Sequence, residues 1–169
     1  MFNVNEYVIY GAIGVCRIEE IIERTVCGIK NEYYVLKPAF ENKATVYVPV
    51  KNEQLTAKMK KVLSAEEIYA LIRSIPSSDS VWIENEQERK KEYARILAGG
   101  DRAELICMIK TLYIHKQDRI KNKKKLHISD ENFFKEAERL LYEEFAHVLD
   151  IKRSQVVPFI AERIEVDKR

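Results

Sequence analysis

Residues 44–75, ATVYVPVKNEQLTAKMKKVLSAEEIYALIRSI, contain the change in hydrophobic period that decides the fold. Residues 44–50 are rich in Val and partly alternate between apolar and polar side chains, which is typical of a β-strand. Ser64 and Glu67 have the spacing of a capping box, and the apolar residues beyond them recur on one helical face: Ile68, Leu71, Ile72 and Ile75. The chain therefore changes from strands to helices here, and we expect a hinge at residues 52–63.

Three segments before this stretch predict further strands, at residues 4–10 (VNEYVIY), 14–22 (GVCRIEEII) and 32–37 (EYYVLK). Turn residues separate the strands: Gly11 and Gly14, Gly28, and residues 41–43 after Pro38. Pro49 has no N–H for a ladder, so its strand is expected to lie on an edge or to end there. Four or five short strands joined by tight turns predict a small antiparallel sheet of the Tudor or SH3 kind.

Helical period continues from residue 64 to the end of the chain. A second helix is predicted at residues 82–98, a third after the cap Asp101, a fourth from Ser129, and a fifth after Ser154 with Pro158 in about its first turn. The predicted fold class is therefore α+β. A Tudor-like sheet domain at residues 1–60 is followed by an all-helical bundle of about five helices at residues 61–169.

Composition excludes several classes of protein. The 169 residues are 46% hydrophobic and 33% charged, which is typical of a globular, water-soluble chain rather than a disordered one. No apolar run approaches the roughly 18 residues that a membrane span needs, and no signal peptide is recognisable, so we expect a cytoplasmic protein. Cys16, Cys27 and Cys107 are odd in number and widely spaced, which indicates reduced thiols.

Motifs for catalysis, metals and cofactors are missing from the sequence. His115, His127 and His147 lack metal-ligand spacing, and the glycines at residues 11–14 match no phosphate-binding loop. We therefore expect no catalytic residues, no metal and no cofactor, and a protein that is not an enzyme.

Positive charge is concentrated locally, although the net charge is only +2. Residues 110–125, KTLYIHKQDRIKNKKK, contain seven Lys or Arg and one Asp, and a second basic group lies nearby: Arg89, Lys90, Lys91, Arg95 and Arg102. These groups indicate either solvated helix ends or a face that contacts phosphates. Glu84, Glu86, Glu88 and Glu92 are interspersed among them, and we expect these glutamates to face away from any bound duplex.

Trp82, the only tryptophan, precedes the second predicted helix in SDSVWIENEQERKKEY (residues 78–93). One interpretation is a buried hydrophobic staple that packs back onto the first turns of the helix. The other is an exposed aromatic that wedges into or stacks on a nucleic acid.

The order of these features resembles the CarD family of bacterial transcription regulators, whose first domain is similar to the polymerase-interacting module of transcription-repair coupling factors. The resemblance rests on VNEYVIYGAIGVCRIEEI, RTVCGIKNEYYVLKP, TVYVP, the single Trp82, ILAGGD and KTLYIHK, which occur in the family order along nearly the full chain. It implies a non-catalytic regulator that binds the β subunit of RNA polymerase through its sheet domain. The expected polymerase contacts are Arg24 and the edge strand Thr45, Val46, Tyr47, Val48 and Pro49. Tyr47 stands where many relatives have Arg.

The resemblance also implies that the helical domain binds promoter DNA and stabilises the open complex. Trp82 is expected to wedge into the minor groove at the upstream edge of the bubble, without base-specific readout. The expected phosphate contacts are Arg89, Lys90, Lys91, Arg95, Lys123, Lys124 and Lys125, with Lys110 and Lys116 as further candidates. We expect a monomer. The alternative is an interaction adaptor on RNA polymerase that makes no direct DNA contact.

Overall fold

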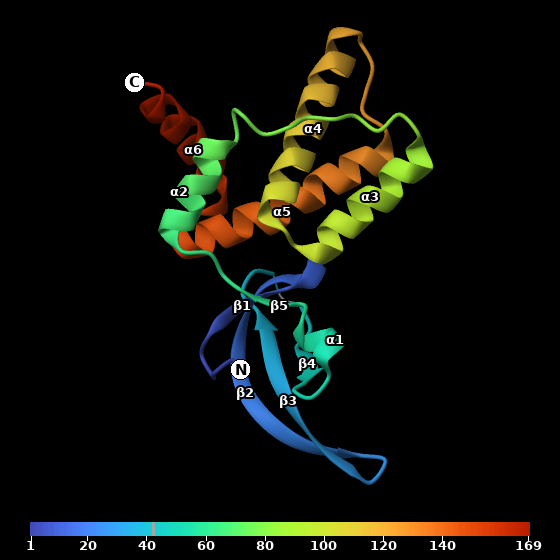
Figure 1. The fold of residues 1–169 in the computed structure, drawn as a ribbon, viewed down its shortest axis with the longest axis vertical. Coiled ribbons are helices and arrows are strands. Elements are labelled where there is room, and N and C mark those ends of the chain that lie inside the picture. Colours follow the sequence, from blue (N-terminus) through green and yellow to red (C-terminus); the bar gives the residue numbers. More distant parts are fainter. Residues whose placement is uncertain (42) are drawn as a thin grey trace. The chain divides into compact units, whose positions relative to one another are not determined.

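Strands occupy the first part of the chain, with one short helix among them, and longer helices occupy the rest (Figure 1). The computed structural model describes residues 1–41 and 43–169, and the chain divides into two units, Met1–Val62 and Leu63–Arg169. Within the described residues, the first unit holds all of the strands and the second holds five helices. The predicted class, a small antiparallel sheet followed by about five helices, is confirmed.

The first unit, hereafter the sheet unit, is built on five antiparallel strands. These are β1 (Tyr7–Tyr10), β2 (Gly14–Val26), β3 (Ile29–Pro38), β4 (Val46–Pro49) and β5 (Met59–Lys61). A single 3-10 turn, η1 (Gly11–Ile13), joins β1 to β2. The order across the sheet is β4-β3-β2-β1-β5, so β4 and β5 form its edges. Pro49 ends an edge strand, as its missing N–H predicts.

The β2–β3 hairpin is longer than the sequence predicted. Val26 pairs with Ile29, and the two residues between them, Cys27 and Gly28, both have positive φ, 51° and 78°. Two consecutive residues of positive φ form a type I′ turn, whose twist matches that of the flanking strands and keeps them paired to their ends. Strand prediction from alternation missed this extension because the apolar residues there, Val26, Cys27 and Ile29, do not alternate regularly with the polar residues around them.

The prediction of a hinge at residues 52–63 is wrong for most of that segment. Asn52 caps a short helix, α1 (Glu53–Thr56), by accepting a hydrogen bond from the N–H of Leu55 at 3.1 Å. The next residues form β5, which pairs with β1. The strand has only three residues, MKK, too few for a period to be visible. The expected turn at residues 41–43 includes Asn42, which lies outside the described residues.

One face of the sheet carries the core of this unit. Its fully buried members include Val8, Ile18, Leu36 and Val48, which come from four strands. Cys16 belongs to the same cluster, and burial raises the pKa of its thiol to about 11. Cys27 is exposed at the turn of the hairpin, and all three cysteines are free thiols.

The second unit, hereafter the helical unit, contains α2 (Ala65–Ser74), α3 (Glu86–Gly99), α4 (Arg102–Lys121), α5 (Ile128–Leu149) and α6 (Arg153–Asp167). The capping box of Ser64 with Glu67 and the Asp101 cap are confirmed. The start of the second predicted helix was wrong, because Asn85 caps α3 through the N–H groups of Gln87 and Glu88, which leaves Trp82 outside the helix. Pro158 lies in the second turn of α6 rather than the first.

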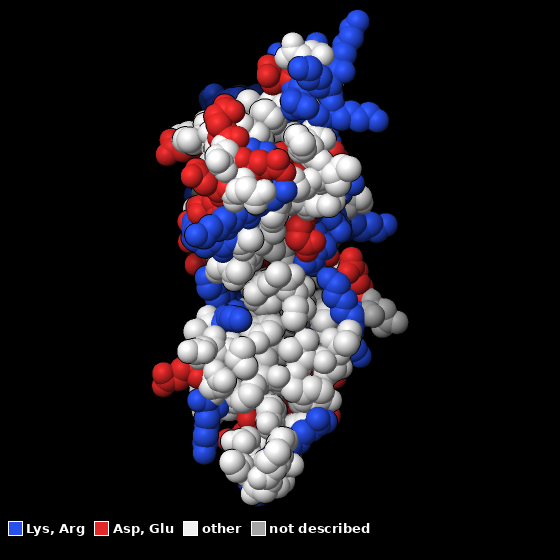
Figure 2. All heavy atoms as spheres, turned by 90° about the vertical axis from the view of Figure 1, so that its right-hand side faces the viewer, with Lys and Arg blue, Asp and Glu red and all other residues white. Residues whose placement is uncertain are grey.

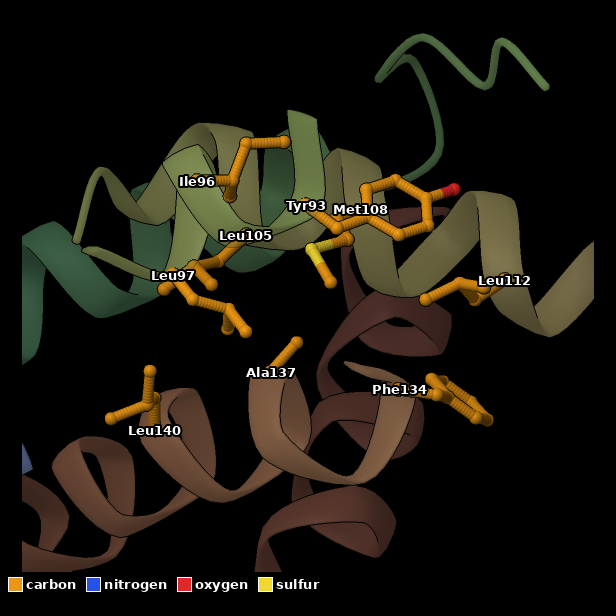
Figure 3. Close-up of a cluster of buried hydrophobic side chains, with 9 residues drawn as sticks. All are labelled: Tyr93, Ile96, Leu97, Leu105, Met108, Leu112, Phe134, Ala137 and Leu140. Carbon is orange, nitrogen blue, oxygen red and sulfur yellow. The ribbon is translucent and has the colours of Figure 1, made fainter. Parts of the chain in front are cut away.

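Three helices supply the main core of the helical unit, as Figure 3 shows. Side chains from α3, α4 and α5 point toward one another there: Tyr93, Ile96 and Leu97; Leu105, Met108 and Leu112; and Phe134, Ala137 and Leu140. Trp82 packs against the side of this cluster. The core therefore fixes the positions of α3, α4 and α5, the helices whose side chains surround Trp82.

Candidate functional site

The segment between α2 and α3 has no helix or strand, yet side chains of the helical unit tie it down. The ammonium group of Lys110, on α4, donates hydrogen bonds to the carbonyls of Ile75, Pro76 and Ser78 at 3.0, 3.1 and 2.8 Å. These three bonds use the donors of the ammonium group. Lys110, which the sequence offered as a further DNA contact, therefore holds the start of the segment in place.

Trp82 is partly buried, which lies between the buried staple and the exposed wedge that the sequence left open. Its ring stacks on the imidazole of His115 in α4, with centroids 3.5 Å apart and an interplanar angle of 10°. The guanidinium of Arg89, in the first turns of α3, lies 4.4 Å from the centroid of the same ring. Trp82 therefore packs onto its helix as a staple would, while part of its surface stays open to solvent.

Arg89 is not at the surface, which corrects its assignment as a phosphate contact. Its residue is only 4% exposed, and its guanidinium donates two hydrogen bonds to the Asp130 carboxylate at 2.8 and 2.9 Å. Two further bonds go to the carbonyls of Ile83 and Glu84 at 2.9 and 3.3 Å. Because Asp130 is itself 1% exposed, each buried charge would be strongly destabilising without the other as its partner. Arg89 thus secures the loop that carries Trp82.

His115 stands in a mixed electrostatic environment. Desolvation by burial is the main cause that lowers its pKa below the ordinary value, and the cations Arg119 and Arg89 lower it further. Asp130 and Asp118 act in the opposite direction. The neutral imidazole is therefore favoured at neutral pH, and a neutral ring stacks on an indole without adding a second cation beside Arg89.

Two of the other basic residues of α3, Lys90 and Arg95, are accessible but paired. Lys90 forms an ion pair with Glu86 at 2.5 Å, and Arg95 bridges Glu92 and Glu104 at 2.6 and 2.7 Å. Glu86 and Glu92 therefore lie beside basic residues of the same helix, and the expectation that the glutamates face away from a bound duplex stays a prediction. Such exposed pairs are weak, so phosphates can compete for the cations.

Lys91 is also exposed, and no ion pair involving it is found among the described residues.

Lys123, Lys124 and Lys125 follow the end of α4 and are all exposed. The guanidinium of Arg119 donates to the carbonyl of Lys125 at 2.7 Å, which fixes the turn, and Lys123 has a positive φ of 56°. Figure 2 shows Lys and Arg side chains gathered at the end of the helical unit where this turn lies. The structure thus places these lysines together on the surface.

In the sheet unit, the residues expected to contact polymerase lie on and beside the β4 edge. Arg24 and Tyr47 are exposed, and the guanidinium of Arg24 lies 4.1 Å from the centroid of the Tyr47 ring. Thr45 is exposed just before β4, whereas Val48 is fully buried in the core. Val46 and Pro49 are half-buried.

Hydrogen-bond alternation identifies which groups the β4 edge leaves open. The N–H of Val50 donates to the carbonyl of Glu32 on the β3 side at 2.9 Å. Alternate residues of an antiparallel strand point their backbone groups to opposite sides, so Tyr47 points its N–H and carbonyl to the open edge. Figure 2 also shows a broad area without charged side chains on this unit. Exposed apolar residues of the unit include Ile21, Val26, Ile29 and Tyr47.

His115 and Asp130 are site residues that sequence reasoning missed, because both act through contacts between distant parts of the chain. Among the described residues, no group of three or more His, Cys, Asp or Glu side chains is arranged to hold a metal ion. None of the described helices has the length and apolar character that crossing a bilayer requires.

Comparison with known protein families gives two matches that together cover most of the chain. Residues 2–63 match a family model described as the CarD-like/TRCF RID domain, where RID denotes the RNA polymerase-interacting domain. Residues 67–161 match a model described as the CarD C-terminal domain. A search of curated proteins found no match.

Proposed function

The chain belongs to the CarD family, whose members are non-catalytic transcription factors, and on that premise we propose how its two units act. The sheet unit binds the β subunit of RNA polymerase through the edge strand β4. The helical unit binds promoter DNA at the upstream edge of the bubble, where Trp82 enters the minor groove and stabilises the open complex.

The observation that carries the DNA proposal is the setting of Trp82. Its indole is supported by His115 and Arg89 on a loop that Lys110 and Arg89 tie to the helical core. A supported aromatic loses little conformational freedom when it meets DNA, which favours its use as a wedge. An apolar side chain in an unstacked base step hinders closure of the duplex, and this is the physical basis for a longer-lived open complex.

Phosphate contacts supply the affinity in this proposal. Lys90, Lys91 and Arg95 follow Trp82 on α3, and Lys123, Lys124 and Lys125 form the second basic group. Lysine and arginine contacts to phosphates position a protein on DNA without reading its sequence. Release of the counterions makes such binding strongly salt-dependent. Arg89 is left out of this set, because its guanidinium is buried and already donates four hydrogen bonds within the protein.

Polymerase binding is proposed to occur by addition of a strand to β4. Tyr47 offers an N–H and a carbonyl to a partner strand, as in other cases of β-augmentation. The cation–π contact with Arg24 places a positive charge beside this open edge. Tyr47, which stands where many relatives have Arg, thereby carries the cation of Arg24 over its ring.

The wedge is tested by Trp82→Ala in an assay of open-complex lifetime, with polymerase binding measured in parallel. Loss of the wedge is expected to shorten the lifetime about tenfold, which corresponds to about 1.4 kcal/mol. The control is Tyr113→Ala, which removes an aromatic ring from α4 that is 55% exposed. An unchanged lifetime for Trp82→Ala, with polymerase capture intact, would contradict the wedge mechanism.

The polymerase contact is tested by two changes in the sheet unit. Arg24→Glu reverses the charge beside β4, and Tyr47→Pro removes the N–H that points to the open edge. Both are expected to weaken capture of the β subunit. The control is Arg17→Glu, a charge reversal at another exposed position of β2. If the control weakens capture equally, the contact is not specific to the β4 edge.

The adaptor without DNA contact is a second candidate, favoured by the stacking of Trp82 on His115. Because Trp82 is the only tryptophan, its fluorescence reports on this site alone. Quenching or a spectral shift on addition of fork-junction DNA supports the wedge. Blue-shifted emission whose intensity and wavelength do not change when DNA is added supports the adaptor.

A further inference from the structure

A cleft of about 430 Å³ lies where α4 ends and α5 begins. Four lysines line it, and they come from α4, from the turn after α4 and from α5: Lys116, Lys124, Lys125 and Lys135. Lys135 was not among the basic residues that the sequence singled out. The volume of the cleft falls within the range of about 300–1,000 Å³ that small-ligand sites occupy.

The electrostatics of the cleft favour an anion. Among its described lining residues, Glu131 is the one carboxylate, and it pairs with Lys116 at 3.3 Å. The ammonium groups of Lys124, Lys125 and Lys135 form no ion pair with any described residue. The N-terminus of α5 also borders the cleft at Ile128, and its N-cap residue makes no side-chain cap hydrogen bond. The positive end of the helix dipole therefore adds to the charge of the lysines.

The cleft also has an apolar floor, which a simple anion would leave unused. Ile120, Leu126 and Ile128 contribute it. Ile120 is 53% exposed and Ile128 is 80% exposed, so a ligand can still remove apolar surface from water here. A suitable ligand has an uncharged body of moderate size joined to phosphate groups.

We propose that this cleft binds an unpaired nucleotide. Its base and sugar lie over Ile120 and Ile128, while Lys124, Lys125 and Lys135 hold the adjoining phosphates. The proposal rests on the proposed function, since the melted promoter is the source of single-stranded DNA, and a free nucleotide has the same chemistry. Proteins that bind single strands combine a basic track with surfaces against which bases pack. The proposal adds Lys135, Ile120 and Ile128 to the residues that contact nucleic acid.

Binding of a fluorescein-labelled oligothymidylate to the full chain, followed by anisotropy over a series of salt concentrations, tests the proposal. Lys124→Gln/Lys135→Gln removes two phosphate contacts and is expected to reduce the slope of log affinity against log salt by about 1.4. Ile128→Ser is expected to weaken binding about tenfold without changing that slope. Because Ile128 is largely exposed, its replacement leaves the core intact.

A matched control, Lys168→Gln, removes a lysine that lies outside the cleft in the same unit. It is expected to leave the slope and the affinity nearly unchanged. Unlabelled oligothymidylate that competes at lower concentration than thymidine monophosphate supports the strand as the ligand, while thymidine monophosphate that competes at least as well identifies a free nucleotide. Inorganic phosphate that competes as well as thymidine monophosphate overturns the role of the apolar floor. Equal binding by Ile128→Ser and the unchanged protein overturns the proposal.

Two further outcomes separate the cleft from the other proposals. Loss of binding to phosphatidylcholine–phosphatidylserine vesicles in the cleft variants, with oligothymidylate binding unaffected, would assign the cleft to a lipid surface and overturn the nucleotide proposal. Trp82→Ala is expected to keep the salt slope for oligothymidylate, because Trp82 does not line the cleft. If Trp82→Ala leaves the open-complex lifetime unchanged while the cleft variants lose oligonucleotide binding, the wedge fails and the cleft stands.

Discussion

Replacement of Arg89 by Met gives the sharpest test of what holds the Trp82 loop. Methionine keeps an unbranched apolar stem like that of arginine but has no guanidinium. The change therefore removes the two bonds to Asp130, the two bonds to loop carbonyls and the cation beside the indole. It leaves the carboxylate of Asp130, which is 1% exposed, without a partner. Breaking a buried pair from one side costs about 3–5 kcal/mol in the free energy of unfolding.

Urea unfolding followed by Trp82 fluorescence measures this loss in the helical unit, where the only tryptophan lies. With a loss of about 4 kcal/mol and a slope of about 2 kcal/mol per molar urea, the midpoint is expected to fall by about 2 M. The double variant Arg89→Met/Asp130→Leu removes both charges and is expected to recover most of the lost stability, because no unpaired charge remains.

Arg95→Met is the matched control for this experiment. Arg95 lies on the same helix and also binds carboxylates, those of Glu92 and Glu104, but these pairs are exposed. Exposed pairs contribute little to stability, so the midpoint is expected to move only slightly. If Arg89→Met moves the midpoint no more than Arg95→Met does, burial of the Arg89–Asp130 pair is not what stabilises the loop.

Two other predictions concern pH and the hairpin. Burial lowers the pKa of both His115 and His147, so below pH ~6.5 the unfolded chain binds more protons than the folded chain and the free energy of unfolding falls as the pH drops toward the folded pKa. The melting temperature of His147→Gln is therefore expected to change less between pH 7 and pH 5.5 than that of the unchanged protein, and an equal change contradicts this assignment. Gly28→Ala places a Cβ at a φ of +78° and is expected to cost the sheet unit about 1 kcal/mol, which calorimetry checks; no loss would show that the turn tolerates a side chain there.

The fold was predictable where a local pattern determines it. The caps at Ser64 and Asp101 act over three residues, so the sequence alone located the starts of α2 and α4. Pro49 likewise limits strand pairing through its own missing N–H, so its effect was readable from one residue. The three residues of β5 are different, because their pairing with β1 depends on a distant strand rather than on their own alternation.

The candidate site was predictable only in part, for the same reason. The sequence located Trp82 and the basic groups, but burial decides which of the basic residues remain available. Arg89 and Asp130 are 41 residues apart, and no periodicity in the sequence pairs them. His115 has no motif around it in the sequence, and only the fold places its ring against the indole of Trp82.

The stack on His115 sets an energetic condition on the proposed wedge. Aromatic stacking is worth about 0.5–1.5 kcal/mol beyond area burial, and a partly exposed cation–π contact is worth about 0.5–2 kcal/mol. If the indole must leave these contacts to enter DNA, the new contacts must offset roughly 1–3.5 kcal/mol before any net stabilisation appears. An intact duplex adds the cost of unstacking a base step, a few kcal/mol, whereas a fork junction is already open at its edge. This cost therefore favours the proposed action of Trp82 on a melted promoter over its insertion into closed DNA.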